Sequence, residues 1–329
     1  MEILSSNNYV STENMQQDFA GIKDAISLPS SGTAVEFQVG DILISNIRPY
    51  LKKIWLSDRN GGCSTDVLAL RTKNEKVDSS FLYCCLANDD FVSYVMSGAK
   101  GVKMPRGDKQ HILSYNLGVP SVQEQRRIAE LVSLLEKRIS AQSKIIEEQE
   151  TLLKSLADSL ISSQVANMAL NDCVVARSSA MKESELENSG PFPVFGASGL
   201  CGYSNEALEE SDSILVTKDG SGVGTCQYAT GAHSFLGTLC SLTAKEGVYL
   251  PYVYYALLNF NFASFKTGLA IPHIYFKDYG KAIIYCPSYD EQVRIASGLE
   301  KIEAKIKSDK ELLKQYQLQK EYLLSRMFI

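Results

Sequence analysis

Apolar residues recur at alternating steps of four and three along two long stretches of this chain. The first stretch runs from Ser121 to about Ser162, and the second runs from Ser288 to the end of the sequence. This spacing predicts two helices that each keep one seam turned toward a partner helix. The seam positions are Ile128, Val132, Leu135, Ile139, Gln142, Ile146, Gln149, Leu153, Leu156 and Leu160 in the first helix, and Ile295, Leu299, Ile302, Ile306, Asp309, Leu313, Tyr316, Lys320, Leu323 and Met327 in the second.

Both helices begin with the same signal. Residues 120–129 and 287–296 share the pattern Pro-Ser-x-x-Glu-Gln-x-Arg-Ile-Ala. The proline stops the preceding segment, the serine is a favoured N-cap, and the glutamate three residues later completes a capping box. The chain is therefore two copies of one unit, each a globular part followed by a long helix.

The first seam is too long for a compact domain to cover, since the helix measures roughly 60 Å at 1.5 Å per residue. We expect the two helices to pair with each other as an antiparallel coiled coil, because two equal units joined by equal rods bury the most surface around a pseudo-two-fold axis. Gln142, Gln149, Asp309 and Lys320 are polar seam positions. Polar residues in a seam often fix the register at some cost in stability.

The globular parts repeat as well. Residues 212–216 align with 41–45, and residues 252–259 with 81–88, at an offset of 171, while Pro272 matches Pro105 at an offset of 167. We therefore expect an α+β fold with two pseudo-symmetric globular domains separated by two long helices. The expected segments are 1–119 (first domain), 120–164 (central helix), 165–286 (second domain) and 287–329 (C-terminal helix).

Within the first domain, the pattern predicts a buried strand within residues 40–45, strands at 67–70 and 117–119, and a helix over residues 79–96. The first copy shows no obvious counterpart of Ala169–Cys173. We therefore expect the first domain to be short at its N-terminus.

The composition is that of ordinary globular protein, with 45% hydrophobic residues, 22% charged residues and a formal charge of -5. This charge argues mildly against a wholly basic nucleic-acid binder but leaves room for basic faces. No apolar run is long enough to cross a bilayer, and the N-terminus is not a signal peptide. The eight cysteines are scattered without a Cys-x-x-Cys pair and there are three histidines. Buried thiols in a reducing cytosol are thus favoured over a structural zinc site.

The layout resembles the specificity subunit of type I restriction-modification systems, with its two target recognition domains. Two variable globular units each end in Pro-x-x-x-Glu-Gln-x-x-Ile and a long helix. Residues 40–53 and 63–66 look like a common version of that family's recognition domain, and residues 219–224 and 268–274 look like the equivalents in the second copy. The resemblance covers nearly the whole chain, and the two helix starts are specific in combination.

The resemblance implies a non-catalytic, DNA-recognition subunit. Each recognition domain would read one half of a bipartite sequence in double-stranded DNA, and the paired helices would fix the gap between the halves. Two modification subunits with S-adenosylmethionine-dependent adenine methyltransferase activity would dock on the helices, and restriction subunits with ATP-driven translocation and nuclease activity would join them. S-adenosylmethionine, ATP and Mg are accordingly expected on the partner subunits, and the complex in the bacterial or archaeal cytoplasm without a membrane partner.

Reading DNA requires cations for phosphates and forked or amide side chains for base edges. Loops broken by Gly or Pro carry such side chains in both domains, and the competing interpretation is that they are solvated surface charges. His273 takes the position of Arg106 in the repeat. The candidate DNA-binding residues are Arg48, Lys52, Lys53, Lys100, Lys103, Arg106 and Lys109 in the first domain, and Lys218, Ser221, Lys266, His273, Tyr275 and Lys277 in the second.

Other features favour plain structural roles. Residues 220–225 are rich in Gly but lack the Gly-Lys-Ser/Thr ending of a P-loop, so we predict a hairpin tip. Trp55 is predicted to be a core residue rather than a base-stacking platform, and Glu124 and Glu291 are predicted to cap helices. No methyltransferase Asn-Pro-Pro-Tyr motif, supported Ser-His-Asp arrangement or metal cluster is present in the sequence.

One alternative function remains open at this point. The chain could be a pseudo-symmetric coiled-coil adaptor that bridges two partner copies without reading DNA. Loops that differ between the repeats while the frame is kept favour recognition over this alternative. An enzyme built on the Gly-rich loop is the weakest hypothesis.

Overall fold

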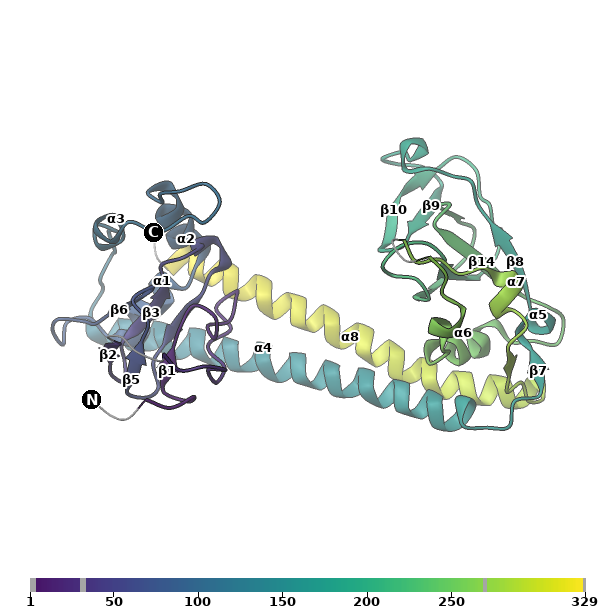
Figure 1. Cartoon of the computed structure of the whole chain (residues 1–329), viewed down its shortest axis with the longest axis horizontal. Coiled ribbons are helices and arrows are strands. Elements are labelled where there is room, and N and C mark those ends of the chain that lie inside the picture. The colour runs from purple at the N-terminus through teal and green to yellow at the C-terminus, as the bar shows by residue number, and fades with distance from the viewer. Residues whose placement is uncertain (1–3, 30–33, 269–270, 328–329) are drawn as a thin grey trace. The chain divides into compact units, whose positions relative to one another are not determined.

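The computed structural model describes residues 4–29, 34–268 and 271–327, with side chains up to residue 324. Leu269, Ala270 and the side chain of Met327, which belong to segments singled out above, lie outside the described residues. The chain divides into two compact units (Figure 1): unit 1 comprises Met1–Gln142 with Leu312–Ile329, and unit 2 comprises Ser143–Glu311. Each unit therefore holds one globular part and one section of each long helix.

The globular part of unit 1 is built on two small sheets. In one, β3 lies between β4 and β6 and is antiparallel to both; in the other, β5 lies between β1 and β2. The elements are β1 (Tyr9–Val10), β2 (Val35–Phe37), β3 (Ile42–Ser45), a 3₁₀ turn (Pro49–Leu51), β4 (Ile54–Leu56), β5 (Gly61–Cys63), β6 (Val67–Leu70), α1 (Ser79–Leu86), α2 (Asp89–Ser97), α3 (Lys109–Leu113) and α4 (Val122–Ala157), whose first part lies in this unit.

Alternation along β3 sends its side chains into two separate cores. Leu43 packs in a cluster with Phe37 and Trp55, whose rings meet edge to face with centroids 5.9 Å apart. Ile42 and Ile44 pack in a second cluster with apolar residues of α1, α2 and α3. Trp55 is only 9% exposed, which confirms the prediction that it is a core residue.

The helix predicted over residues 79–96 is two helices, α1 and α2. Asn88 separates them: its Oδ1 accepts the Phe91 N–H at 2.9 Å, and its Nδ2 donates to the Cys85 carbonyl at 2.7 Å. Asparagine favours such caps because its short side chain competes with the helical backbone bonds. The prediction of one helix was wrong, because the apolar pattern continues across Asn88 although the helix itself does not.

Unit 2 repeats this frame with additional strands. Its main sheet has the order β12-β11-β14-β8, a second sheet has the order β10-β9-β13, and β15 pairs with β7. The elements are the rest of α4, a π-helical turn (Asp158–Ser162), β7 (Met168–Ala169), α5 (Leu170–Cys173), β8 (Val174–Ser178), 3₁₀ turns (Glu183–Glu185 and Phe262–Phe265), β9 (Phe192–Gly196), β10 (Gly199–Ser204), β11 (Ser213–Thr217), β12 (Cys226–Ala229), β13 (Ser234–Phe235), β14 (Leu239–Ala244), α6 (Leu250–Leu258), α7 (Phe276–Tyr279), β15 (Ile283–Ile284) and the first part of α8 (Tyr289–Met327).

Residues 117–119, predicted as a strand, have no regular structure. In unit 2 the corresponding segment contains β15, which is a strand because it pairs with β7, with Ile283 opposite Ala169. A strand needs a hydrogen-bonded neighbour. Among the described residues of unit 1, no strand pairs with 117–119, so the prediction was wrong although the sequence is apolar.

The glutamine shared by the two helix starts is a buried clamp. Gln125 Oε1 accepts the Asp78 N–H at 2.8 Å, and Gln292 Oε1 accepts the Tyr249 N–H at 2.9 Å. Each Nε2 donates to the carbonyl of the proline five residues earlier, at 2.9 Å and 2.8 Å. Gln125 and Gln292 are 0% and 1% exposed. The clamp therefore ties the start of each long helix to the residue that precedes α1 or α6.

Glu124 and Glu291, which precede these glutamines, make different contacts in the two copies. Ser121 Oγ accepts the Glu124 N–H at 3.3 Å, as an N-cap does. In the second copy the Glu291 carboxylate is bound by the Arg294 guanidinium, with contacts of 2.8 Å and 2.5 Å. The serine cap of the predicted capping box is thus present in the first copy, while the Glu291 side chain pairs with its own helix.

In unit 1 the first section of α4 packs against the last section of α8. Leu324 joins the cluster around Ala129 and Val132, and Lys320 Nζ lies 2.8 Å from Glu136 Oε1. Positions rise along α4 as they fall along α8, so the two helices are antiparallel, as predicted.

The same antiparallel pairing occurs in unit 2, where polar groups meet across the seam. Gln149 Nε2 donates to Asp309 Oδ2 at 2.9 Å, and Lys310 Nζ lies 2.6 Å from Glu150 Oε1. Lys305 adds a second bond to Asp309, at 2.7 Å. The predicted seam residues are buried at Val132, Leu135, Ile146, Leu153, Ile295, Leu299 and Ile306, and half-buried at Ile128, Ile139, Leu156, Ile302, Leu313 and Leu323.

The seam of α4 changes register at its end. Leu160, predicted to face the partner helix, is 39% exposed, whereas Ile161 is 2% exposed. Residues 158–162 form a π-helical turn, which takes more residues per turn than an α-helix. The wider turn moves the inward-facing position one residue along the chain, so the prediction for Leu160 was wrong.

The cysteines are free thiols of different accessibility. Among the eight, Cys201 alone is exposed. Burial raises the pKa of Cys63 to about 11 and the pKa of Cys84, Cys85 and Cys226 to about 12. Only the thiolate is nucleophilic, so these four thiols react slowly with electrophiles near neutral pH.

We expect iodoacetamide at pH 8 to alkylate Cys201 well before any other thiol of the folded chain. Peptide mass mapping over a time course checks this, with the urea-unfolded chain as the control in which all sites react. Early labelling of Cys84 or Cys85 would contradict the packing described for α1.

Candidate nucleic-acid interface

In unit 1 a short hairpin of the chain is fastened to the end of β3. Lys100 and Arg106 exchange backbone hydrogen bonds, both 2.9 Å long, and close the hairpin over residues 100–106. The Arg48 N–H donates to the Pro105 carbonyl at 2.8 Å, and the Gly107 N–H donates to the Asn46 carbonyl at 3.1 Å. The loop after β3 and the hairpin therefore form one rigid corner.

Unit 2 contains the same corner built from different residues. Thr267 and His273 exchange backbone hydrogen bonds of 2.9 Å, and the Gly220 N–H donates to the Pro272 carbonyl at 3.0 Å. The Ile274 N–H adds a bond to the Lys218 carbonyl at 2.9 Å. The proline shared by the repeats thus accepts the equivalent bond in both units, while the side chains around it differ.

Five candidate cations of unit 1 lie on or beside the hairpin. Lys103 at its tip is exposed, and Arg48 is exposed at the loop that holds it. Arg106 Nη1 donates to Asp66 Oδ1 at 2.9 Å while the side chain stays 55% exposed. Lys100 pairs with Asp108 at 2.7 Å, and this hydrogen bond raises the pKa of Lys100. Lys109, also exposed, begins α3 immediately after Asp108.

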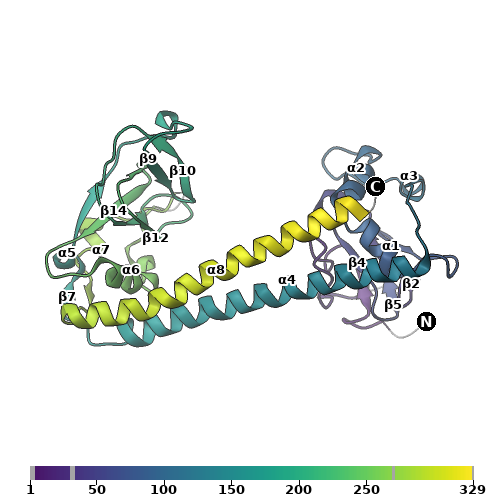
Figure 2. The same ribbon diagram turned by 180° about the vertical axis from the view of Figure 1, so that it is seen from behind.

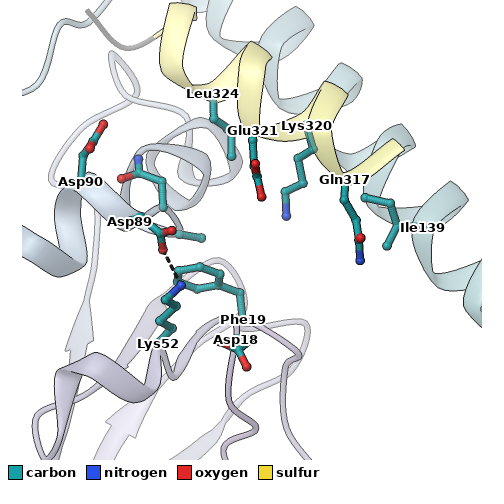
Figure 3. Close-up of a pocket in the computed structure, with 12 residues that line it drawn as sticks. Asp18, Phe19, Lys52, Asp89, Asp90, Ile139, Gln317, Lys320, Glu321 and Leu324 are labelled. Carbon is teal, nitrogen blue, oxygen red and sulfur yellow. Dashed lines mark ion pairs between the residues drawn. The ribbon is translucent and has the colours of Figure 1, made fainter. Parts of the chain in front are cut away.

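Lys52 and Lys53 are placed differently from the other candidates. Lys52 Nζ lies 2.7 Å from Asp89 Oδ1, in a pocket of about 630 Å³ that also faces Lys320 and Glu321 of α8 (Figure 3). The hydrogen bond to Asp89 raises the pKa of Lys52. Lys53 Nζ donates to the Thr12 carbonyl at 2.6 Å. Both ammonium groups are thus engaged within unit 1.

Two backbone positions explain why this segment turns so tightly. Arg48 and Lys52 have φ values of 52° and 54°, in the left-handed region that non-glycine residues rarely adopt. They flank the 3₁₀ turn Pro49–Leu51, which the Lys52 N–H closes onto the Pro49 carbonyl at 2.9 Å. The turn separates Arg48, which faces solvent, from Lys52, which faces Asp89.

In unit 2 three candidates form a contiguous group at the end of the hairpin and directly after it. The His273 and Tyr275 rings meet edge to face with centroids 5.2 Å apart, and Lys277 Nζ lies 5.2 Å from the Tyr275 ring centroid. Tyr275 is 47% exposed. Lys266, at the start of the hairpin, is exposed, and so is Ser221 in the loop after β11. Lys218 is half-buried and pairs with Asp219 at 3.1 Å.

The Gly-rich segment of unit 2 is a hairpin tip, as predicted. The Thr217 N–H donates to the Thr225 carbonyl, and the Thr217 carbonyl accepts the Gly224 N–H, both at 2.9 Å. These two bonds bring the ends of β11 and β12 together. Gly224 has φ of 91°, and a Cβ there would lie 2.8 Å from Phe262 Cβ. The glycine is therefore required by both conformation and space.

Some contributors to the interface were not predicted from the sequence. Asp66 and Asp219 pair with Arg106 and Lys218, although acidic side chains are not expected on a surface that suits phosphates. Asn46 Oδ1 is buried without a hydrogen-bond partner beside the corner. Both aspartates lie within segments 63–66 and 219–224, which resemble the family's recognition domain, and the shared proline marks the position where the hairpin is fastened.

The chemistry that this arrangement offers is binding rather than bond-making. Exposed guanidinium and ammonium groups on rigid loops suit phosphates and base edges. Among residues 4–29, 34–268 and 271–327, no group of three or more His, Cys, Asp or Glu side chains is placed to hold a metal ion. Within the same ranges, no helix has the length and apolar character that crossing a membrane requires.

The chain matches one protein-family model twice. The family is described as the type I restriction modification DNA specificity domain, and the matched residues are 7–150 and 163–317. The chain is 28% identical over 100 residues to the type I restriction enzyme EcoDI specificity subunit of Escherichia coli, which is 30% of this chain and 22% of that protein. It is 22% identical over 117 residues to the EcoprrI specificity subunit of Escherichia coli, which is 36% of this chain and 29% of that protein. The aligned segments therefore span under a third of either relative.

Solved structures share the fold over a greater length. The S subunit of a type I restriction-modification system from M. genitalium matches with a TM-score of 0.68 and 18% identity, over 100% of this chain and 91% of that one. A structure concerned with complex assembly and conformational transition of the type I R-M system matches with a TM-score of 0.58 and 18% identity, over 97% and 90% of the two chains. At this identity the likeness concerns the fold alone.

Proposed function

The chain belongs to the type I restriction-modification DNA specificity family, and we propose that it reads a bipartite sequence in double-stranded DNA with one half-site per unit. The observation that carries this proposal is the corner repeated in the two units. A frame that is kept, with Pro105 and Pro272 accepting equivalent bonds, while Arg106 is exchanged for His273, suits two readers of different half-sites.

The two corners offer different side chains for binding base edges and phosphates. Arg106, oriented by Asp66, has the fork that pairs with guanine, while Lys103 and Arg48 suit phosphates. In unit 2 the His273–Tyr275–Lys277 group combines hydrogen-bonding ring nitrogens, an aromatic face and an ammonium group. The formal charge of -5 is unfavourable for the many phosphate contacts that a tight complex needs, although the basic corners can supply some of them. Partner subunits would supply the rest.

The paired sections of α4 and α8 have two roles in this proposal. Their common length fixes the gap between the half-sites, and their outer faces dock two modification subunits. Adenine methylation with S-adenosylmethionine belongs to those subunits, and ATP with Mg to restriction subunits that join them. The chain itself would perform no covalent step.

The test is co-expression of this chain with its modification subunit in a host that lacks adenine methylation, followed by genome-wide methylation mapping. We expect methylated adenines at a split sequence with a fixed gap, only when this chain is present. A complex that assembles without any such motif would favour the adaptor that bridges partners without reading DNA.

Substitutions at the two corners should act on separate halves of that motif. We expect Arg106→Ala to relax one half-site by about 1–3 kcal/mol of discrimination, and His273→Ala to relax only the other half. Exposed Lys73, in the loop after β6, is the control, and Lys73→Ala should leave the motif unchanged. An effect of Arg106→Ala on both halves would contradict the assignment of one reader to each unit.

A further inference from the structure

A second pocket lies in unit 2, where α6 faces the end of α4 and the first part of α8. α6 lies beside α8 in both views of the chain (Figures 1 and 2). The pocket has a volume of about 620 Å³ and is lined by Tyr228, Pro251 and Tyr254, together with the carboxylates of Glu300 and Glu303. Aromatic faces beside carboxylates suit a cation with an apolar stem.

Glu303 is fixed in the pocket by neutral donors. The Tyr254 hydroxyl donates to its Oε1 at 3.2 Å, and the Tyr255 hydroxyl donates to its Oε2 at 2.7 Å. Burial, together with the nearby Glu303 charge, raises the pKa of both tyrosines, so they stay protonated donors. Both oxygens are thus held in place while each keeps the capacity to accept a further bond.

The lysines that line the pocket do not neutralise Glu303. Lys310 Nζ lies 2.6 Å from Glu150 Oε1 and is engaged there. Lys307 is exposed on α8. In the described part of the chain, neither Lys307 nor any other basic residue forms an ion pair with Glu303.

Unit 1 contains a carboxylate at the position equivalent to Glu303. The offset of 167 between the long helices relates Glu303 to Glu136, and the offset of 171 between the domains relates Tyr254 to Tyr83. In unit 1 the carboxylate has an internal cation, Lys320, whose Nζ lies 2.8 Å from Glu136 Oε1. The residue related to Lys320 in unit 2 is Leu153, an apolar side chain that is 8% exposed.

We propose that the Glu303 pocket receives a lysine or arginine side chain from a docked protein partner, the modification subunit. The ammonium or guanidinium would take the place that Lys320 occupies in unit 1, with its stem along Pro251 and Leu153. A nucleic-acid occupant is disfavoured because three carboxylates and two lysines line the pocket, one lysine being paired with Glu150, so the remaining negative charge would repel phosphates. This assignment rests on the proposed function, since it names a contact of the subunit that the chain is proposed to dock.

The test measures binding of the modification subunit to the full-length chain and to three variants by calorimetry. Glu303→Gln removes the charge and keeps one side-chain oxygen as an acceptor for a tyrosine hydroxyl, and we expect it to weaken binding at least about tenfold. Leu153→Lys supplies the internal cation of unit 1 and should weaken binding by a similar factor. Glu136→Gln, the matched control at a site that has its own lysine, should change the affinity by less than about threefold.

The outcomes separate this proposal from the function on which it rests. Glu303→Gln and Leu153→Lys binding as tightly as the unmodified chain, with melting temperatures unchanged, would overturn the pocket assignment and leave the docking proposal standing. An unmodified chain that does not bind the modification subunit would overturn both. A greater salt dependence for the unmodified chain than for Glu303→Gln supports an ionic contact at Glu303, because salt screens such contacts; equal salt dependence contradicts it.

Discussion

Replacing Gln125 with alanine should destabilise unit 1 by about 3 kcal/mol and lower its melting temperature by about 10 °C. The side chain is fully buried and satisfies three backbone groups: the Asp78 N–H and the carbonyls of Lys76 and Pro120. Alanine leaves all three without a partner in a site that excludes water. Unsatisfied buried groups of this kind cost roughly 1–3 kcal/mol each. Scanning calorimetry measures the total.

Gln123 is the matched control for this prediction, because it lies on the same turn of α4 and is exposed. Gln123→Ala should alter the free energy of unfolding by less than about 0.5 kcal/mol. Hydrogen exchange adds a local test: Gln125→Ala should expose the amides at the start of α1, whose first turn follows Asp78. Equal melting temperatures for the two variants would show that the clamp does not stabilise the junction between α1 and α4.

The sequence was most informative where the two copies could be compared. The alignment of Pro105 with Pro272 marked an equivalent position in the two loops, where the structure shows a fastened hairpin, because a bond to a proline carbonyl depends on the backbone and survives exchange of the neighbouring side chains. The alternating four-and-three spacing likewise predicted that each long helix faces a partner helix, and the repetition of two equal units predicted that the pairing is antiparallel. Comparison of Glu136 with Glu303 gained its meaning only from the structure, since the ion pair to Lys320 spans two distant segments.

Other features could not be read from the sequence for identifiable physical reasons. Lys52 and Arg48 look alike in a basic loop, but a left-handed backbone at both positions turns them in different directions. The π-helical turn after Ala157 changes the seam by one residue without a marker residue such as Pro or Gly. Residues 117–119 have the composition of a strand, and whether they form one depends on a partner segment rather than on their own side chains.

Gly224 is a position where one added methyl group should strongly destabilise unit 2. Gly224→Ala places a Cβ 2.8 Å from Phe262 Cβ and requires φ of 91°, which alanine rarely adopts. Phe262 cannot easily yield, because it is 5% exposed and packs edge to face on Phe260 and Tyr279 with centroids 4.7 Å and 5.3 Å away. We expect a loss of about 3 kcal/mol from strain and overpacking together.

Gly224→Ala should reduce methylation at the half-site of unit 2 as well as the thermal stability of this unit. The hairpin tip, which carries Ser221 and the bond from Gly220 to Pro272, would shift. Methylation that depends on the half-site of unit 2 should therefore fall at least about tenfold at 37 °C. A loss of about 1.4 kcal/mol in the free energy of DNA binding already gives that factor. Gly222→Ala is the matched control in the same loop, since a Cβ there meets only Thr217 and Thr225 at 3.8 Å and no positive φ is required. Methylation mapping and calorimetry on both variants decide the matter. If Gly224→Ala and Gly222→Ala behave alike, the tip does not need the tight approach to Phe262 in order to hold the corner of unit 2.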